Sequence, residues 1–260
     1  MVKSGSMITN LLKYPTLVFI ISLLVLWFAA WTGARLRHRL GLQLAEELHS
    51  DFGVVLGATL TLLGLLIGFS FSMANTRYDL RRSYEEAEAN AIGTEYVRAD
   101  LLPADATQIR NLLRQYTDLR IRFYTTSSQD ELQSINRDTA QVQNKLWAAA
   151  SGPASEQPNP VKALAVSGMN DVLNSQGYTQ AAFWNRIPTA AWGLMATIAV
   201  VCNVLFGYGT HRVEPKLLLI LPLVVAVSFF LIADIDSPRH GIIRVHPQNL
   251  QSLRAGMGDQ

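Results

Sequence analysis

The sequence has little charge and almost no cysteine for its length. Only 16% of its 260 residues are Asp, Glu, Lys or Arg, whereas soluble proteins have about 25%. The formal net charge is only +2, which is too balanced to indicate a polyanionic partner such as nucleic acid. Cys202 is the single cysteine, so neither an intramolecular disulfide nor a CxxC motif can form. These deficits argue against a soluble globular enzyme, a disordered chain and a nucleic-acid binder.

The sequence also lacks the motifs of the common enzyme classes. It contains no GxSxG, no P-loop, no HExxH and no GxGxxG followed by an acidic residue, which are patterns that carry hydrolytic, phosphate-binding or zinc chemistry. Cys202 has no basic neighbour that would stabilise a thiolate. We therefore expect no enzyme activity, no catalytic residue, no metal site and no cofactor.

What the sequence does have is four long runs without a charged residue. The stretch 75–187 holds 25 of the 42 charged residues, and the rest of the chain is correspondingly apolar. The charge-free runs are Tyr14–Ala34, Phe52–Thr76, Ile187–Thr210 and Leu217–Ala233. A helix that crosses a membrane needs about 20 mostly apolar residues. The pattern predicts an all-α membrane protein with four transmembrane helices and a large helical region between the second and third.

The ends of the runs set the expected boundaries. They are 14–34 for the first span, 52–76 for the second, which continues as a helix to about 102, 103–186 for the helical region, 187–210 and 217–236 for the last two spans, and 237–260 for the tail. The first run is alternatively a cleaved secretory signal, but its 21 residues exceed the about 7–15 of a signal core. In the helical region, one helix face is expected at Ile109, Leu112, Leu113, Tyr116 and Phe123.

An even number of spans places both termini and the large helical region on one side of the membrane. Nine basic residues lie near span ends on that side, and five lie on the other side. Because basic residues accumulate on the cytoplasmic side, we expect both termini and the helical region to be cytoplasmic.

The second run carries a stripe of small residues, which are Gly53, Gly57, Thr61, Gly64, Gly68 and Ser72. At 3.6 residues per turn these positions share one helix face. Small residues let transmembrane helices approach closely, so the stripe predicts a helix contact or a pore-facing surface. The alternative is that Gly is simply frequent in membrane helices.

Two further sets of residues, one within this run and one directly after it, each have two interpretations. Ile67 and Phe71 are either bulk that faces the bilayer or a hydrophobic constriction that gates a pore by dewetting. The charges that follow are either pairs along the helix or the lining of a vestibule that attracts and repels ions. These charges are Arg77, Arg81, Arg82, Glu85 and Glu88.

Two carboxylates, Asp234 and Asp236, end the fourth run. A carboxylate at the centre of a bilayer costs at least about 2.5–3.5 kcal/mol, so we place both at the interface. Nearby arginines would hold them there, and the alternative is a metal site shared with His240 and His246. We predict the interfacial arrangement, without a metal.

Four blocks of sequence point to a family. They are GLLIGFSFSMANTRYDLRR (64–82), EANAIGTEYVRADLLP (88–103), LLRQYTDLRIRFY (112–124) and LIADIDSPRHGIIRVHPQNL (231–250). Together they resemble the bacterial bestrophin-like domain family. Bestrophins proper are pentameric ion channels with four spans per subunit, whose pore follows the second span and a cytoplasmic helical vestibule. The resemblance implies a homo-oligomer, with the pentamer of bestrophins as its model, with the lipid bilayer and inorganic ions as partners and the bacterial inner membrane as location.

Two functions are therefore compatible with the sequence. The first is an oligomeric ion channel with its pore along the second span. The second is a non-conducting membrane scaffold or signalling protein whose cytoplasmic helices bind a partner. A ring of copies around an axis lined by the second span would favour the channel, and a monomer or two-fold dimer without an axial cavity would favour the scaffold. The acidic calcium clasp of animal bestrophins has no evident counterpart here, so calcium binding is not implied.

Overall fold

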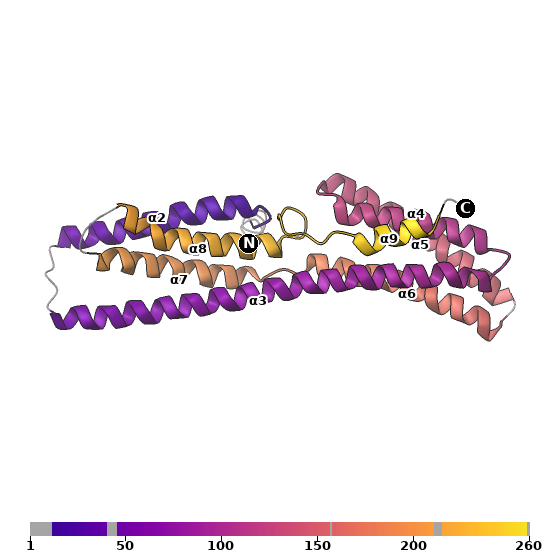
Figure 1. Ribbon diagram of the computed structural model, residues 1–260, viewed down its shortest axis with the longest axis horizontal. Helices are drawn as coiled ribbons and strands as arrows, with labels where there is room; N and C mark the ends of the chain where they lie inside the picture. The colour runs from indigo at the N-terminus through magenta and orange to yellow at the C-terminus, as the bar shows by residue number, and fades with distance from the viewer. Residues whose placement is uncertain (1–11, 41–45, 157, 211–214, 259–260) are drawn as a thin grey trace, which may run out of the picture. The chain divides into compact units, whose positions relative to one another are not determined.

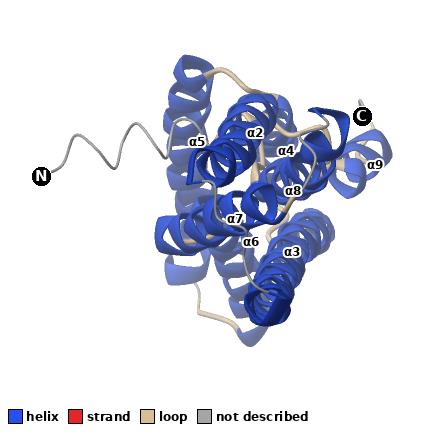
Figure 2. Cartoon of the chain, turned by 90° about the vertical axis from the view of Figure 1, so that its left-hand side faces the viewer, coloured by secondary structure: helices blue, strands red, loops and turns tan. Residues whose placement is uncertain are grey.

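The computed structural model describes residues 12–40, 46–156, 158–210 and 215–258. Within these ranges the regular elements are all helices, as predicted (Figures 1 and 2). The helices are α2 (Pro15–Leu40), α3 (Glu46–Arg98), the short 3-10 helix η1 (Ala99–Leu101), α4 (Ala106–Thr125), α5 (Gln129–Glu156), α6 (Pro160–Trp184), α7 (Thr189–Gly209), α8 (Pro215–Asp236) and α9 (Gln248–Gly256).

The chain divides into two compact units, which are described separately. The membrane unit comprises Met1–Thr76 and Arg186–Ile243, and the polar unit comprises Arg77–Asn185 and Arg244–Gln260. Helix α3 contributes to both, because the division falls between Thr76 and Arg77. That point is also the end of the second charge-free run.

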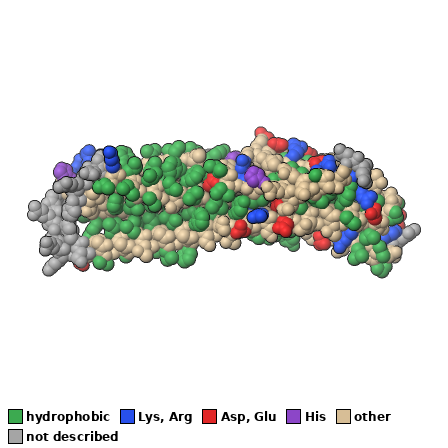
Figure 3. Space-filling model, viewed as in Figure 1, with side chains coloured by type: hydrophobic (Ala, Val, Ile, Leu, Met, Phe, Trp, Pro, Cys, Tyr) green, Lys and Arg blue, Asp and Glu red, His purple; other side chains and the backbone are tan. Residues whose placement is uncertain are grey.

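Four stretches of the described helices are long and apolar enough to cross a membrane, which confirms the predicted number of spans. They are Pro15–Arg39, Asp51–Leu101, Pro160–Gly209 and Lys216–Asp236. Hydrophobic side chains cover much of the visible surface of the membrane unit (Figure 3). Such a surface is stable in hydrocarbon and unfavourable in water.

Close packing of α2 against α7 depends on two glycines. Gly33 of α2 lies against the backbone of Val204, and Gly207 of α7 lies against the backbone of Ala30. A Cβ atom at either glycine would overlap the carbonyl oxygen of the opposite helix. Helix α8 also packs along α2 (Figure 1). Because lipid offers no hydrophobic drive to join helices, this close contact is what holds them together.

The polar unit has a core of its own, built around α4. Ile109, Leu113, Tyr116 and Phe123 are fully buried, on the face that the sequence predicts. Helix α5 packs on α4 and α6, and the C-terminal helix α9 packs on α4. The start of α6 follows from local chemistry, since the Asn159 side chain accepts a hydrogen bond from the N–H of Val161 at 2.9 Å.

Candidate functional site

The six small residues of α3 all lie on its exposed surface, which we call the glycine face. A Cβ atom built at Gly53, Gly57, Gly64 or Gly68 meets nothing within 4 Å outside its own helix in the described part of the chain. The Thr61 hydroxyl donates to the Gly57 carbonyl at 2.8 Å, so its hydrogen bond is made within α3. The glycine face is therefore a smooth surface that the single chain leaves uncovered.

The opposite side of α3 contacts the rest of the membrane unit. Leu63, Ser70 and Ala74 are buried there. Near the start of the span, the rings of Phe52 and Tyr208 lie 5.7 Å apart between centroids. The inward side is occupied by the chain itself, whereas the glycine face is exposed, as is the bulkier side of α3 that carries Leu65 and Phe69.

The two predicted constriction residues differ in exposure. Ile67 is half-buried, whereas the side chain of Phe71 is 43% exposed. Phe71 follows Gly64 by two helical turns, so it lies at the edge of the glycine face. Phe69 is 63% exposed and lies on a different side of the helix. A constriction at Ile67 and Phe71 stays a prediction.

Three of the five predicted vestibule charges are buried in the polar unit. Arg81, Glu85 and Glu88 have exposed fractions of 2%, 1% and 0%. Arg81 Nε donates to the carbonyl of Ala182 at 3.2 Å. Glu85 accepts the N–H of Leu250, in the first turn of α9, at 3.0 Å. These charges bind segments of their own unit together and are therefore not available to ions in a water-filled vestibule.

The remaining two vestibule charges are accessible. Arg82 is exposed, and Arg77 is half-buried with a hydrogen bond of 2.6 Å from Nη1 to Oδ1 of Asn185. Both follow the membrane segment of α3 within two turns. Of the five residues predicted to line a vestibule, Arg77 and Arg82 are therefore the two that remain candidates.

Glu88 forms a buried ion pair that the sequence did not reveal. Its carboxylate lies 2.5 Å from Arg120 Nε, and both side chains are inaccessible to solvent. Tyr124 and Thr179 add hydrogen bonds to Glu88 of 3.3 Å and 3.1 Å. Burial is the largest single effect on Arg120 and opposes its charge, but the Coulomb attraction and hydrogen bond of Glu88, together with the neighbouring Tyr116 and Tyr124, outweigh it and raise the Arg120 pKa.

A signal for this burial was present in the sequence. The buried positions of α3 in the polar unit are spaced four and three residues apart, as in a helix with one face in a core. They are Arg81, Glu85, Glu88, Ile92 and Glu95, with Ala89 buried beside Glu88 and Ala99 of η1 continuing the series. Charged residues at core spacing point to partners across the core rather than along the helix.

The two carboxylates after the fourth run are structural. Asp234 accepts the backbone N–H groups of Ile242 and Ile243 at 2.7 Å and 2.8 Å. Asp236 accepts the N–H of Ile187, just before α7, at 3.2 Å. Backbone amides thus anchor both carboxylates, and Arg186 also interacts electrostatically with Asp236. The predicted roles of Arg239 and Arg244 stay a prediction. No cluster of three His, Cys, Asp or Glu that could hold a metal lies in the described ranges.

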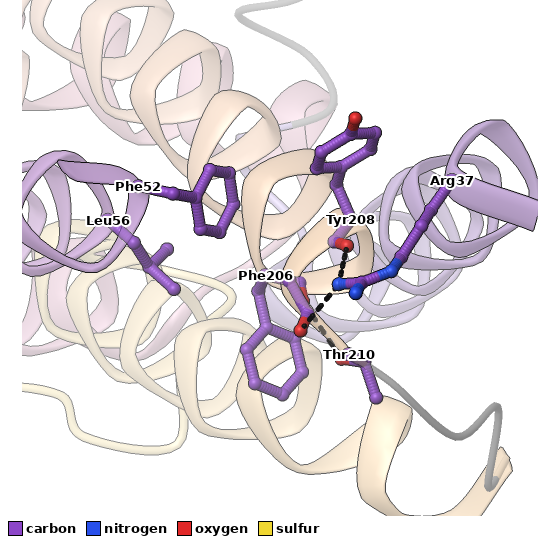
Figure 4. A pocket seen from close by; sticks show the side chains of 7 residues that line it. Arg37, Phe52, Leu56, Phe206, Tyr208 and Thr210 are labelled. Atoms are coloured by element: carbon purple, nitrogen blue, oxygen red, sulfur yellow. Dashed lines mark hydrogen bonds between the residues drawn. The ribbon is translucent and has the colours of Figure 1, made fainter. Parts of the chain in front are cut away.

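A cavity of about 250 Å³ lies in the membrane unit where α2, α3 and α7 meet (Figure 4). Arg37 Nη1 donates to the carbonyl oxygens of Tyr208 and Gly209, at 3.0 Å and 3.2 Å. Phe52 and Leu56 of α3 complete one side of the cavity. The arginine satisfies carbonyl groups at the C-terminus of α7, which complements that end of the helix dipole.

Comparison with solved structures supports the same architecture. The structure of a bacterial Bestrophin homologue from Klebsiella pneumoniae aligns with a TM-score of 0.64 over 92% of this chain and 96% of that chain, at 12% identity. Two point mutants of a Klebsiella pneumoniae homologue align with a TM-score of 0.64, at 14% and 13% identity, over 92% and 94% of this chain and 97% of each mutant chain. At this identity the likeness shows the fold alone.

A search of curated protein sequences finds no match. The family comparison is decisive, because residues 20–250 match the Bestrophin-like domain. The match includes the last three membrane spans, most of the first span and most of the polar unit. The chain belongs to the Bestrophin-like domain family.

Proposed function

We propose that copies of this chain assemble into a ring that forms an ion channel in the bacterial inner membrane, with the membrane part of α3 along the pore. The observation that carries the proposal is the glycine face. It runs the length of the second span and no other part of the described chain covers it. The family membership and the bestrophin fold support the same assignment.

The glycine face suits contact with a neighbouring copy of α3. Large side chains would keep two helices apart, whereas glycine lets backbones approach and gain van der Waals contact in lipid. The Thr61 hydroxyl can be buried in this contact without losing a hydrogen bond, since it already donates to the Gly57 carbonyl. In a ring, each α3 then meets its neighbours at this face and presents its edge to the axis.

The edge that would face the axis carries Phe71, with Ile67 one turn before it. Repeated around a ring, these apolar side chains would form a constriction that excludes water when it is narrow. Arg77 and Arg82 would follow at the mouth of the pore and set the local potential there. The nine basic residues near span ends on the side of the termini, against five on the other side, favour a cytoplasmic location for the polar unit.

Ion flux into liposomes tests the proposal. We expect the purified oligomer to pass ions, and Ile67→Ala and Phe71→Ala to raise the flux severalfold, because a smaller side chain widens and hydrates a constriction. Phe69→Ala is the matched control. It removes the same side chain two residues away, from a position expected to face lipid, and should leave the flux unchanged.

A folded oligomer that passes no ions at varied pH, calcium concentration and voltage would contradict the channel. A two-fold dimer without an axial cavity would do the same. Either result would favour a membrane scaffold whose polar unit binds a partner.

A further inference from the structure

Glu95 is a buried carboxyl group without a hydrogen-bonding partner. It lies on α3 in the polar unit, its residue is 0% exposed, and neither carboxylate oxygen has a partner among the described residues. The span of α3 that fits a bilayer core, about 20 residues, ends at Thr76, so Glu95 lies outside the membrane. An ionised carboxylate in this position would be costly, because no donor replaces its lost hydration.

The carboxyl group is built into the contact between α3 and α6. A Cβ atom at Gly168 of α6 would overlap Glu95 Oε2 and would lie 2.6 Å from Nη1 of Arg98. Gly168 is itself buried. The bare backbone of α6 at this glycine therefore makes the space that the carboxyl group occupies.

The charges around Glu95 come from both helices. Arg98 on α3 favours the ionised form and Asp171 on α6 disfavours it, but burial is the largest effect. Together they raise the pKa of Glu95 to about 8. The ordinary pKa of an exposed glutamate is about 4.3.

We propose that Glu95 is a proton-binding site, which holds a neutral carboxyl group between α3 and α6 and loosens this contact when it loses the proton. The ligand is the hydrogen ion, and the site consists of Glu95, the backbone at Gly168 and the flanking Arg98 and Asp171. Below the pKa the acid is neutral, so its burial in this contact costs less than burial of a carboxylate. Above the pKa a carboxylate without donors appears there, and water must enter to solvate it.

The sign of the pH effect follows from proton linkage. Between the unfolded and folded pKa values, the folded protein keeps the proton that the unfolded chain has lost. The stabilisation from the neutral Glu95 is therefore complete below about pH 4.5, declines as the pH rises, and is gone above about pH 8. Mildly alkaline conditions loosen the polar unit, and neutral conditions keep it closed.

Thermal unfolding of the intact protein in detergent tests the site. Between about pH 5 and pH 9 we expect the melting temperature of the wild type to fall relative to that of Glu95→Gln, because glutamine is a neutral isostere at every pH. Glu86→Gln, which changes an exposed residue of the same helix, should follow the wild-type profile. Parallel profiles for the wild type and Glu95→Gln would overturn the proposal.

Infrared difference spectroscopy on the wild type gives a second readout that does not depend on the variant. The carbonyl band of a protonated carboxyl group should persist at neutral pH and disappear with a midpoint near pH 8. A midpoint near that of an exposed glutamate, about 4.3, would contradict the site even if Glu95→Gln failed to fold. Neither measurement involves ion flux, so the proton site and the channel can fail independently.

Discussion

The two halves of α3 are used in opposite ways. In the polar unit, the helix buries Arg81, Glu85, Glu88 and Glu95 among neighbouring helices of the same chain. In the membrane unit it has no charged residue between Phe52 and Thr76, and its glycine face is uncovered. The half of α3 in the polar unit is held by hydrogen bonds and an ion pair within that unit. The half in the membrane unit leaves its glycine face free for a molecule outside the chain.

The difference reflects what surrounds each half. In water, a folded unit can bury a charge when another group in the unit pairs with it, as Arg120 does with Glu88. In hydrocarbon, helices join mainly by close approach, and glycine permits that approach. Gly33 and Gly207 make such a contact within the chain, because each lies against the backbone of the opposite helix.

The largest effect is expected in the polar half. Arg120→Met leaves the Glu88 carboxylate buried without its charge partner, which should reduce the free energy of unfolding by about 3–5 kcal/mol. The double variant Glu88→Gln with Arg120→Met should recover part of this loss, since no unpaired charge remains. Denaturant unfolding of both variants measures the difference, and an unchanged stability in Arg120→Met would show that the ion pair contributes little.

A smaller effect should separate covered from uncovered glycines within the membrane unit. Gly207→Ala places a methyl group on the Ala30 carbonyl, and overpacking of this kind costs about 1–3 kcal/mol. Gly193→Ala, on the same helix but in open space, should be neutral or slightly stabilising because alanine favours helix. Thermal stability in detergent compares the two, and equal losses would refute the assigned α2–α7 contact.

The smallest effect on the single chain should come from the glycine face. Gly64→Leu fills open space, so the stability of one copy should change by less than about 0.5 kcal/mol. Assembly should nevertheless be lost, since a bulky side chain separates the backbones of neighbouring copies. Ala58→Leu, an exposed position away from the glycine face, is the control. Size-exclusion chromatography with light scattering measures the oligomeric state of both variants. An intact Gly64→Leu oligomer would show that the glycine face is not the contact between copies.

Much of the fold could be predicted from the sequence because its signals are local. Charge-free runs of 17 to 25 residues identify the four spans, and apolar periodicity identifies the face of α4 that forms a core. The small-residue stripe likewise follows from spacing along one helix. Each of these features depends on residues that are close together in the chain.

The partners of the charged residues could not be predicted in this way. Glu88 pairs with Arg120, and Glu85 bonds to Leu250 of the distant C-terminal helix. Asp234 and Asp236 are held by backbone amides, which carry no signal in the amino-acid type. Pairing along the helix was the local interpretation, and it gives no information about these contacts between distant segments.

By itself, the sequence determined that this chain is a helical membrane protein and which face of the second span is small, since both depend on the period of a helix and the thickness of a bilayer. Only the tertiary structure decided which charges are buried, which glycines are covered and where a carboxyl group lies without a donor. Those outcomes depend on which distant segments meet, and burial changes the energy of a charge far more than its position along the chain does.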